Sequence, residues 1–139
     1  MKTAVSQTIA AEEYQRLLHA NLVRVFGERD RARRQLAIAD LYLPDAVLYE
    51  PDAVAAGHDA ICQAVETLLA QLPPAFNFTA HGPAVGHHGV ARLRWTAGPA
   101  NGPVVVTGTD VALLRSGRIQ SLYVFIDPPA TEPVLTLQE

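Results

Sequence analysis

The chain has 139 residues, of which 49% are hydrophobic and 18% are charged. This length and composition predict one folded domain and exclude a disordered chain, which would be far less hydrophobic. The net charge of −3 excludes the basic surface typical of nucleic-acid-binding proteins. No run approaches the roughly 20 apolar residues of a membrane span, and the first residues do not have the pattern of a signal peptide. We therefore expect a cytoplasmic protein that binds neither nucleic acid nor membranes.

The first half of the sequence predicts three helices, because apolar residues recur there at helical spacing. Asp30 is a suitable N-cap for the second helix, and Pro44 cannot continue it. Asn21 lies on the apolar stripe of the first helix, so we count it among the candidate ligand-binding residues. The expected helices are residues 14–27, 30–43 and 57–72.

The second half of the sequence alternates apolar and polar residues with a period of two, which is typical of strands. Four strands are expected there, and a fifth lies between the second and third helices. The order predicts an α+β fold in which the helices pack on one face of a curved antiparallel sheet. The expected strands are residues 46–50, 76–81, 90–95, 104–115 and 119–127.

Common catalytic and metal-binding signatures are missing from the sequence. The five histidines do not form HExxH or any other ligand pair at helical spacing, and the single cysteine, Cys62, excludes an intrachain disulfide and a cysteine-built metal site. We interpret Cys62 as a small packing residue. The sequence contains neither GxSxG nor a glycine-rich phosphate loop. We therefore expect no metal and no cofactor.

Two carboxylates stand in apolar strands, and they are the candidates for chemistry. Asp110 shares one face of its strand with aliphatic residues, which predicts that it points inward. A buried carboxyl must be paired, hydrogen-bonded or protonated with a raised pKa. Glu50 follows an apolar run and precedes a proline. The alternatives are a salt bridge from Asp110 to Arg92, Arg94 or Arg118, and a simply exposed Glu50.

Three segments in this order resemble the NTF2-like superfamily, and within it the SnoaL-like and ketosteroid-isomerase-like proteins. The segments are ADLYLPDAVLYEP, AAGHDAICQAV and VVVTGTDVALLRSGRIQSLYVF. The resemblance extends over residues 18–127. It implies a cystatin-like cone, in which three N-terminal helices pack on a strongly curved sheet that encloses an apolar pocket. Residues 1–139 then form a single domain, with 130–139 as a C-terminal extension.

The same resemblance implies a set of site residues. Glu50 matches the general base of the isomerases, and Asp110 matches the protonated acid of their oxyanion hole or the acid/base aspartate of SnoaL-like cyclases. The tyrosine that supplies a second oxyanion donor in the isomerases has no counterpart, since its position falls near Leu22; the tyrosine supporting it falls near Val65. The implied pocket-lining residues are Phe78, Leu93, Trp95, Leu122, Val124 and Ile126.

These residues predict a cofactor-free enzyme that transfers a proton on a small hydrophobic carbonyl compound, as an isomerase or a polyketide-cyclase-like enzyme. The alternative is a non-catalytic protein that binds a small hydrophobic molecule. A third possibility, an epoxide-hydrolase-like Asp-Arg-Asp system, lacks an acid two residues after Arg92. We also expect a homodimer through the outer face of the sheet, where Val105, Tyr123 and Phe125 are placed.

Overall fold

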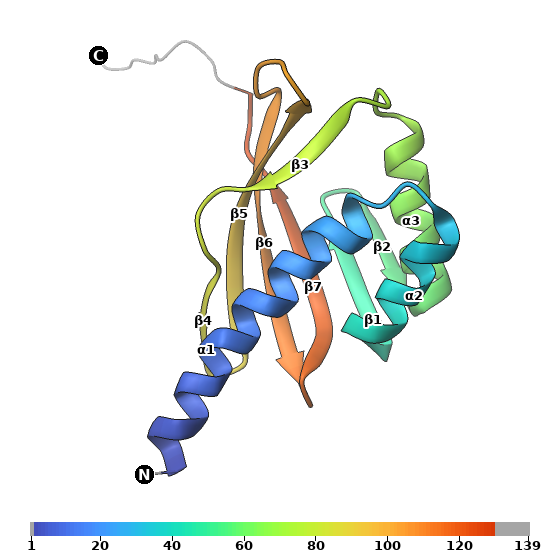
Figure 1. Ribbon diagram of the computed structural model, residues 1–139. Coiled ribbons are helices and arrows are strands. Elements are labelled where there is room, and N and C mark those ends of the chain that lie inside the picture. The colour runs from blue at the N-terminus through green and yellow to red at the C-terminus, as the bar shows by residue number, and fades with distance from the viewer. Residues whose placement is uncertain (1, 130–139) are drawn as a thin grey trace, which may run out of the picture.

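Three helices pack against one curved sheet of seven strands in the computed structural model, which describes residues 2–129 (Figure 1). The α+β class expected from the sequence is confirmed. The helices are α1 (Lys2–Ala20), which continues into a π-helical turn, η1 (Asn21–Phe26), then α2 (Arg31–Leu41) and α3 (His58–Ala70). The strands are β1 (Tyr42–Glu50), β2 (Ala53–Ala56), β3 (Phe76–Ala80), β4 (Val85–His87), β5 (Val90–Pro99), β6 (Val106–Arg115) and β7 (Arg118–Ile126).

The strands follow the order β2-β1-β7-β6-β5-β3, with β4 added along β5. Strands β5, β6 and β7 form the expected antiparallel meander, but β1 pairs with β7 in parallel. The expectation of a wholly antiparallel sheet is therefore wrong at this one contact. Strands β2 and β4 were not predicted, because each is too short to show a period-two pattern.

The boundary between α2 and β1 differs from the sequence prediction. The side chain of Asp30 accepts the Arg33 backbone N–H at 2.9 Å, which confirms the expected N-cap. The helix ends at Leu41, however, and β1 begins at Tyr42 and continues through Pro44. The pairing of β1 with β7 is interrupted between Tyr42 and Val47, so Pro44 lies where no ladder hydrogen bond is required of it.

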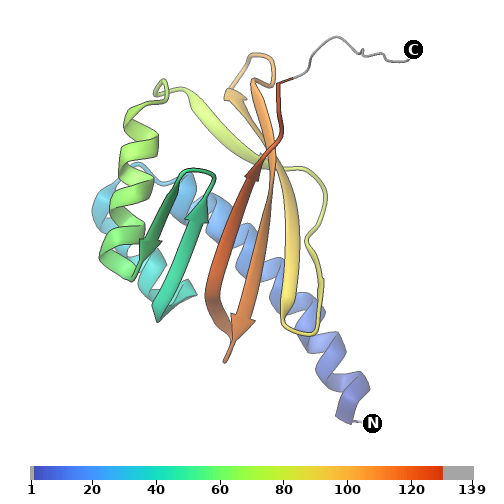
Figure 2. The same cartoon turned by 180° about the vertical axis from the view of Figure 1, so that it is seen from behind.

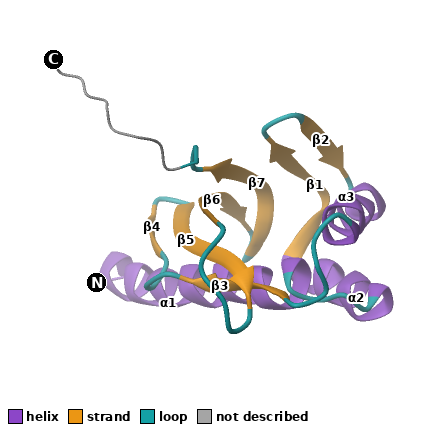
Figure 3. Ribbon diagram, turned by 90° about the horizontal axis from the view of Figure 1, so that it is seen from above, coloured by secondary structure: helices purple, strands orange, loops and turns teal. Residues whose placement is uncertain are grey.

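The helices lie along the concave side of the sheet, and α1 crosses it diagonally (Figures 1 and 3). Helix α1 packs against β4 and β5, whereas α3 packs against β1 and β2. Apolar side chains from the helices and from the inward positions of the strands form one buried cluster. Cys62 belongs to this cluster, as its interpretation as a packing residue requires.

A buried arginine connects α2 to α3. The Arg34 guanidinium is fully buried; it donates to the Glu28 carbonyl oxygen at 2.6 Å and forms an ion pair with Glu66 on α3. Removing the Glu66 carboxylate would leave the buried Arg34 charge without its ion-pair partner, which is destabilising. This contact fixes the position of α3, which carries part of the wall of the site described below.

The outer face of the sheet carries aromatic residues on β1 and β7; Figure 2 shows the sheet in front of α1. The rings of Tyr49 and Tyr123 stack with centroids 4.5 Å apart, and Phe125 is 55% exposed. Val105 is also exposed, but it precedes β6 instead of lying within it. No helix among residues 2–129 is long and apolar enough to cross a membrane.

Candidate active site

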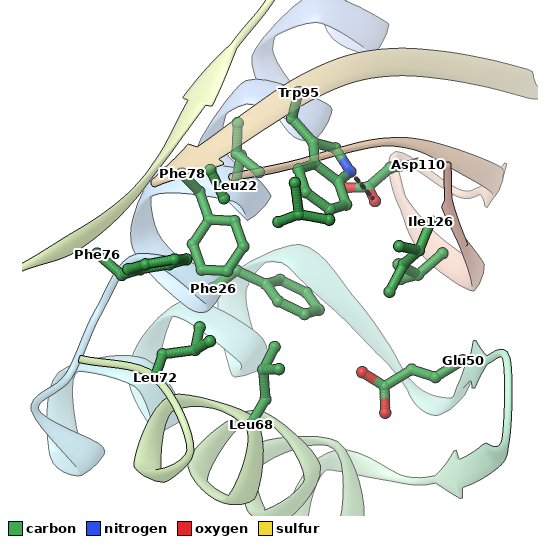
Figure 4. A pocket seen from close by; sticks show the side chains of 13 residues that line it. Leu22, Phe26, Glu50, Leu68, Leu72, Phe76, Phe78, Trp95, Asp110 and Ile126 are labelled. Atoms are coloured by element: carbon green, nitrogen blue, oxygen red, sulfur yellow. Dashed lines mark hydrogen bonds between the residues drawn. The ribbon is translucent and has the colours of Figure 1, made fainter. Parts of the chain in front are cut away.

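A cavity of about 210 Å³ opens at one end of the cone, between η1, α3 and the concave face of the sheet (Figure 4). Three lining side chains carry polar groups: the carboxyls of Glu50 and Asp110 and the indole of Trp95. The other lining residues are apolar: Leu22, Phe26, Leu68, Leu72, Phe76, Phe78, Ala97, Val106, Val124 and Ile126.

Asp110 lies on the inner wall of this cavity. It stands on β6 between Leu93 of β5 and Val124 of β7, and it is only 3% exposed. Its Oδ1 accepts a hydrogen bond from Trp95 Nε1 at 2.9 Å. Burial raises the pKa of Asp110 from 3.8 to about 7, and the indole hydrogen bond acts in the opposite direction. Near neutral pH the carboxyl therefore exists in both its neutral and its charged form.

The salt-bridge alternative for Asp110 fails. Arg94 lies on the opposite face of β5, where its nearest carboxylate is that of Asp127 at 3.9 Å. No ion pair of Asp110 is found among residues 2–129. Arg92 is likewise exposed and does not line the cavity. This placement of the two arginines also argues against the epoxide-hydrolase-like alternative, which needs an arginine in the pocket.

Gly108 makes the contact between Trp95 and Asp110 possible. Trp95 on β5 is paired with Gly108 on β6, so the indole lies across the glycine and reaches the carboxyl two residues along. A Cβ at Gly108 would lie 2.3 Å from Trp95 Cζ2 and 2.5 Å from the Phe125 carbonyl oxygen. Only a glycine fits there, because neither the packed indole nor the backbone can give way by that amount. The edge of Phe78 packs against the indole from the other side, with centroids 5.7 Å apart.

Glu50 is the last residue of β1, where the strand turns at Pro51 into the short hairpin with β2. Its side chain is half-buried and directed into the cavity, with Ile126 between it and Asp110 (Figure 4). Burial raises the pKa of Glu50, and the negative charge of Asp52 adds to this effect. Among the described residues, no hydrogen bond or ion pair restrains the Glu50 carboxylate. It is therefore free to accept a proton from a bound molecule.

The helical wall supplies no second donor. Leu22 lines the cavity, and it occupies the position near which the resemblance places the oxyanion tyrosine. Tyr14 lies outside the cavity, where its hydroxyl accepts the backbone N–H of Gly89 at 2.7 Å. The hydrogen-bonding set inside the cavity is thus limited to the two carboxyls and the indole.

A buried polar pair lies beside the cavity; the sequence singled out Asn21 but not its partner, Tyr42. The Tyr42 hydroxyl donates to Asn21 Oδ1, and Asn21 Nδ2 has no partner among the described residues. Burial raises the pKa of Tyr42 well above 10.0, and the negative charges of Asp110 and Glu50 raise it further. Tyr42 is therefore a neutral hydroxyl close to both carboxyls. It could be noticed in the sequence only once β1 is known to begin at that residue.

Residues 20–122 match the SnoaL-like domain family. The chain belongs to this family. No curated protein matches the sequence significantly.

Solved structures share the fold of this SnoaL-like chain. A candidate isomerase of the SnoaL-like family from Agrobacterium tumefaciens is 24% identical, with a TM-score of 0.78 over 84% of this chain and 99% of that one. A candidate polyketide cyclase from Sinorhizobium meliloti is 18% identical, with a TM-score of 0.60 over 78% of this chain and 92% of that one. A protein with a cystatin-like fold from Methylobium petroleophilum is 20% identical, with a TM-score of 0.66 over 92% of this chain and 84% of that one. The cystatin-like, NTF2-like cone expected from the sequence is thereby confirmed.

The candidate ligand-binding residues of this SnoaL-like chain divide into two groups. Phe78, Trp95, Val124 and Ile126 line the cavity. Leu93 and Leu122 face the same way but are fully buried in the core, because each lies one inward position farther from the open end. Asn21 is buried behind the wall, where it pairs with Tyr42. The sequence analysis did not identify the lining residues of η1 and α3, whose inward direction depends on how the helices dock.

The described residues of this SnoaL-like chain hold no group of three or more His, Cys, Asp and Glu side chains arranged to bind a metal. None of the five histidines lines the cavity. His87 and His88 contact each other in an exposed turn, and His58 approaches the backbone carbonyls of Tyr42 and Leu43.

Proposed function

We propose that the chain catalyses cofactor-free proton transfer on a small hydrophobic carbonyl compound, as an isomerase or a polyketide-cyclase-like enzyme. One observation carries the proposal: two carboxyls, both with raised pKa values, line a single apolar cavity. Two structural relatives are themselves described as a candidate isomerase and a candidate polyketide cyclase, which is consistent with this chemistry.

The two carboxyls have different roles in the proposed reaction, base and hydrogen-bond donor, because their surroundings differ. Glu50 lies near the open end and is only half-buried, so it is the group that ionises more readily and acts as the base. Asp110 lies deep in the cavity and keeps its proton up to a pKa of about 7. A neutral carboxylic acid in an apolar site can donate a hydrogen bond to an oxyanion. Trp95 holds Asp110 Oδ1, which leaves Oδ2 for the ligand.

The reaction follows from this division. The Glu50 carboxylate removes a proton from the carbon next to the substrate carbonyl; the electron pair of the C–H bond forms the C=C bond of the enolate, and the π pair of the carbonyl moves onto its oxygen. Asp110 donates a hydrogen bond to the enolate oxygen as its charge develops. Glu50 then returns the proton to another carbon of the conjugated system. In a cyclase the enolate carbon instead attacks a second carbonyl of the substrate and closes a ring; the π electron pair of that carbonyl moves onto its oxygen, which takes up the proton from Glu50. No oxidant, reductant or metal takes part in either sequence.

The test uses cyclohex-3-en-1-one, whose conversion to the conjugated enone is followed by ultraviolet absorbance. Glu50→Gln keeps the shape of the side chain but removes the base, so we expect kcat to fall by roughly 10²–10⁴-fold. Asp110→Ala removes the donor, and we expect a loss of roughly 10²–10³-fold. Glu12→Gln, an exposed change on α1, is the matched control and should leave the rate unchanged. A rate that survives in Glu50→Gln would refute the assignment of the base.

The pH profile of the wild-type chain provides an independent check. The rate should rise with pH as Glu50 becomes ionised and fall as Asp110 loses its proton near its pKa of about 7. The profile is therefore a bell whose alkaline limb belongs to Asp110. A rate that continues to rise through pH 9 would contradict a neutral Asp110 as the oxyanion donor.

The binding-protein alternative is favoured by one observation: Leu22 replaces the expected second donor, which leaves a predominantly apolar wall. In that case the cavity holds a small hydrophobic molecule without converting it. Tight binding of the ketone together with equal, uncatalysed rates for the wild type and Glu50→Gln would establish this alternative.

We also propose that two copies of the chain pair through the outer face of the sheet. The stacked pair Tyr49–Tyr123 and the exposed Phe125 give this face an apolar, aromatic centre. Association would cover these side chains, which are the type enriched in protein interfaces.

A further inference from the structure

The cavity is continued outward by a second, wider hollow. This outer hollow, here called the vestibule, has a volume of about 670 Å³. Three residues line both spaces, Glu50, Leu68 and Ile126, and we call this ring the mouth. The two spaces therefore adjoin at the mouth, and the proposed base lies at the junction between them.

The inner cavity limits the size of what can reach Asp110. An apolar cavity of about 150 Å³ is large enough to bind benzene. A cavity of about 210 Å³ therefore accepts a single six-membered ring with a carbonyl oxygen and a small substituent, but it is too small for three or four fused rings. A further part of the molecule that passes the mouth would lie in the vestibule.

The two spaces differ in polarity. The inner cavity is walled by aromatic and aliphatic side chains, whereas the vestibule is lined in part by the polar side chains of Asp52, Thr67, Gln71 and Asp127. A ligand that fills both spaces must therefore have an apolar end and a polar end.

The charges around the vestibule have one sign. None of the described residues that line it is Lys, Arg or His. Asp127 accepts a hydrogen bond from the Thr107 hydroxyl, and Arg94 is 3.9 Å away, so part of the Asp127 charge is offset. No such partner of Asp52 is found among the described residues, and its charge acts on Glu50 at the mouth. An anionic group in the vestibule would meet this negative field, and a cationic group would be attracted by it.

We propose that the substrate of this site has two parts: a carbonyl head of one ring, which fills the inner cavity, and a neutral or cationic polar tail, which passes the mouth into the vestibule. This assignment rests on the function proposed above and names the substrate class. It excludes large polycyclic ketones and compounds that carry a phosphate or carboxylate on the tail.

The charge of the tail is tested with three phenols that share one head. The phenol ring and oxygen imitate a one-ring enolate, and the tails of tyramine, 4-propylphenol and 3-(4-hydroxyphenyl)propanoate are cationic, neutral and anionic. Binding is followed by the fluorescence of Trp95, the only tryptophan of the chain, which lines the cavity. We expect the propanoate to bind roughly tenfold more weakly than tyramine at low salt, with a smaller ratio at high salt.

Matched variants locate the origin of this preference. Asp52→Asn should reduce the ratio of the two dissociation constants severalfold. Asp45→Asn changes an exposed carboxylate in the middle of β1 that does not line the vestibule, and the ratio should stay at its wild-type value. Equal binding of the cationic and anionic phenols by the wild type would overturn the proposed tail. A ratio that is the same in Asp52→Asn would overturn the role of Asp52.

The size of the head is tested separately with a rigid three-ring phenol, a phenanthrol. It should bind at least tenfold more weakly than 4-propylphenol to the wild type, and Leu72→Ala should recover binding by enlarging the inner cavity. Leu36→Ala, at an exposed position of α2, is the control. Wild-type binding of the phenanthrol as tight as that of 4-propylphenol would overturn the one-ring limit.

These measurements need no turnover, so they fail or succeed independently of the proposed reaction. The expected order of binding, combined with no Glu50-dependent isomerisation, would refute the reaction and leave the ligand class intact. Isomerisation without the expected order of binding would refute the ligand class and leave the reaction intact.

Discussion

The buried carboxyl of Asp110 makes a quantitative prediction for the substitution Asp110→Asn. Its pKa of about 7 in the folded chain lies well above the ordinary value of 3.8, so the folded state binds more protons between these pH values. Folding stability must therefore fall as pH rises through this window. At 1.36 kcal/mol per pKa unit, the whole difference corresponds to about 4 kcal/mol. Between pH 5 and pH 8, the free energy of unfolding should therefore decrease by about 2–3 kcal/mol.

Asparagine has nearly the same shape, and its Oδ1 can still accept the hydrogen bond of Trp95. The asparagine side chain cannot ionise, so the variant should not show this loss of folding stability with rising pH. The free energy of unfolding, measured by urea titration with far-ultraviolet circular dichroism, is compared between the two proteins at pH 5, 6, 7 and 8. The wild type should weaken relative to Asp110→Asn by about 2–3 kcal/mol over this range. Asp45→Asn serves as the surface control, and its difference from the wild type should be nearly constant. A constant difference for Asp110→Asn as well would refute the buried, raised-pKa carboxyl.

Three further outcomes follow from the contacts of this site. Trp95→Phe removes the hydrogen bond that opposes the raised pKa of Asp110, so the alkaline limb of the rate profile should move to higher pH; a limb moved to lower pH would contradict this. Gly108→Ala forces the Trp95 indole out of its place. We expect a red-shifted Trp95 emission together with a destabilisation of the fold by roughly 1–3 kcal/mol. An unchanged emission maximum would show that the contact between Gly108 and the indole is not tight. Phe125→Asp places a charge in the proposed interface, so sedimentation should show a dimer for the wild type and a monomer for the variant. A wild-type protein that sediments as a monomer at micromolar concentration would refute the interface.

The sequence predicted those features that local patterns control. The alternation along β6 placed Asp110 on the inner face because its companions there are aliphatic, and the structure confirms that it is buried. Asp30 was identified as an N-cap from its residue type alone, and its hydrogen bond is present. Both inferences involve only neighbours within one element.

The features that the sequence did not predict depend on contacts between distant segments. Pro44 predicted a helix that continues to Leu43, yet α2 ends at Leu41, because Tyr42 pairs with Ile119 of β7 and so starts β1. The close approach of Trp95 to Gly108 depends on the register between β5 and β6, which neither strand reveals alone. The vestibule likewise forms only where α3 and the end of β7 meet the turn after β1.

The parallel pairing of β1 with β7 has a consequence for how the molecule folds. Strands β5, β6 and β7 are joined by short connections, residues 100–105 and 116–117, so their contacts are local and can form early. Strand β1 has only β2 and β7 as neighbours in the sheet, and about half of the chain, residues 51–117, separates it from β7. Closing that long loop is entropically unfavourable until the meander exists, which makes docking of β1 a late step. Asp110 belongs to the meander and thus takes its place between Leu93 and Val124 before β1 brings Glu50 to the site.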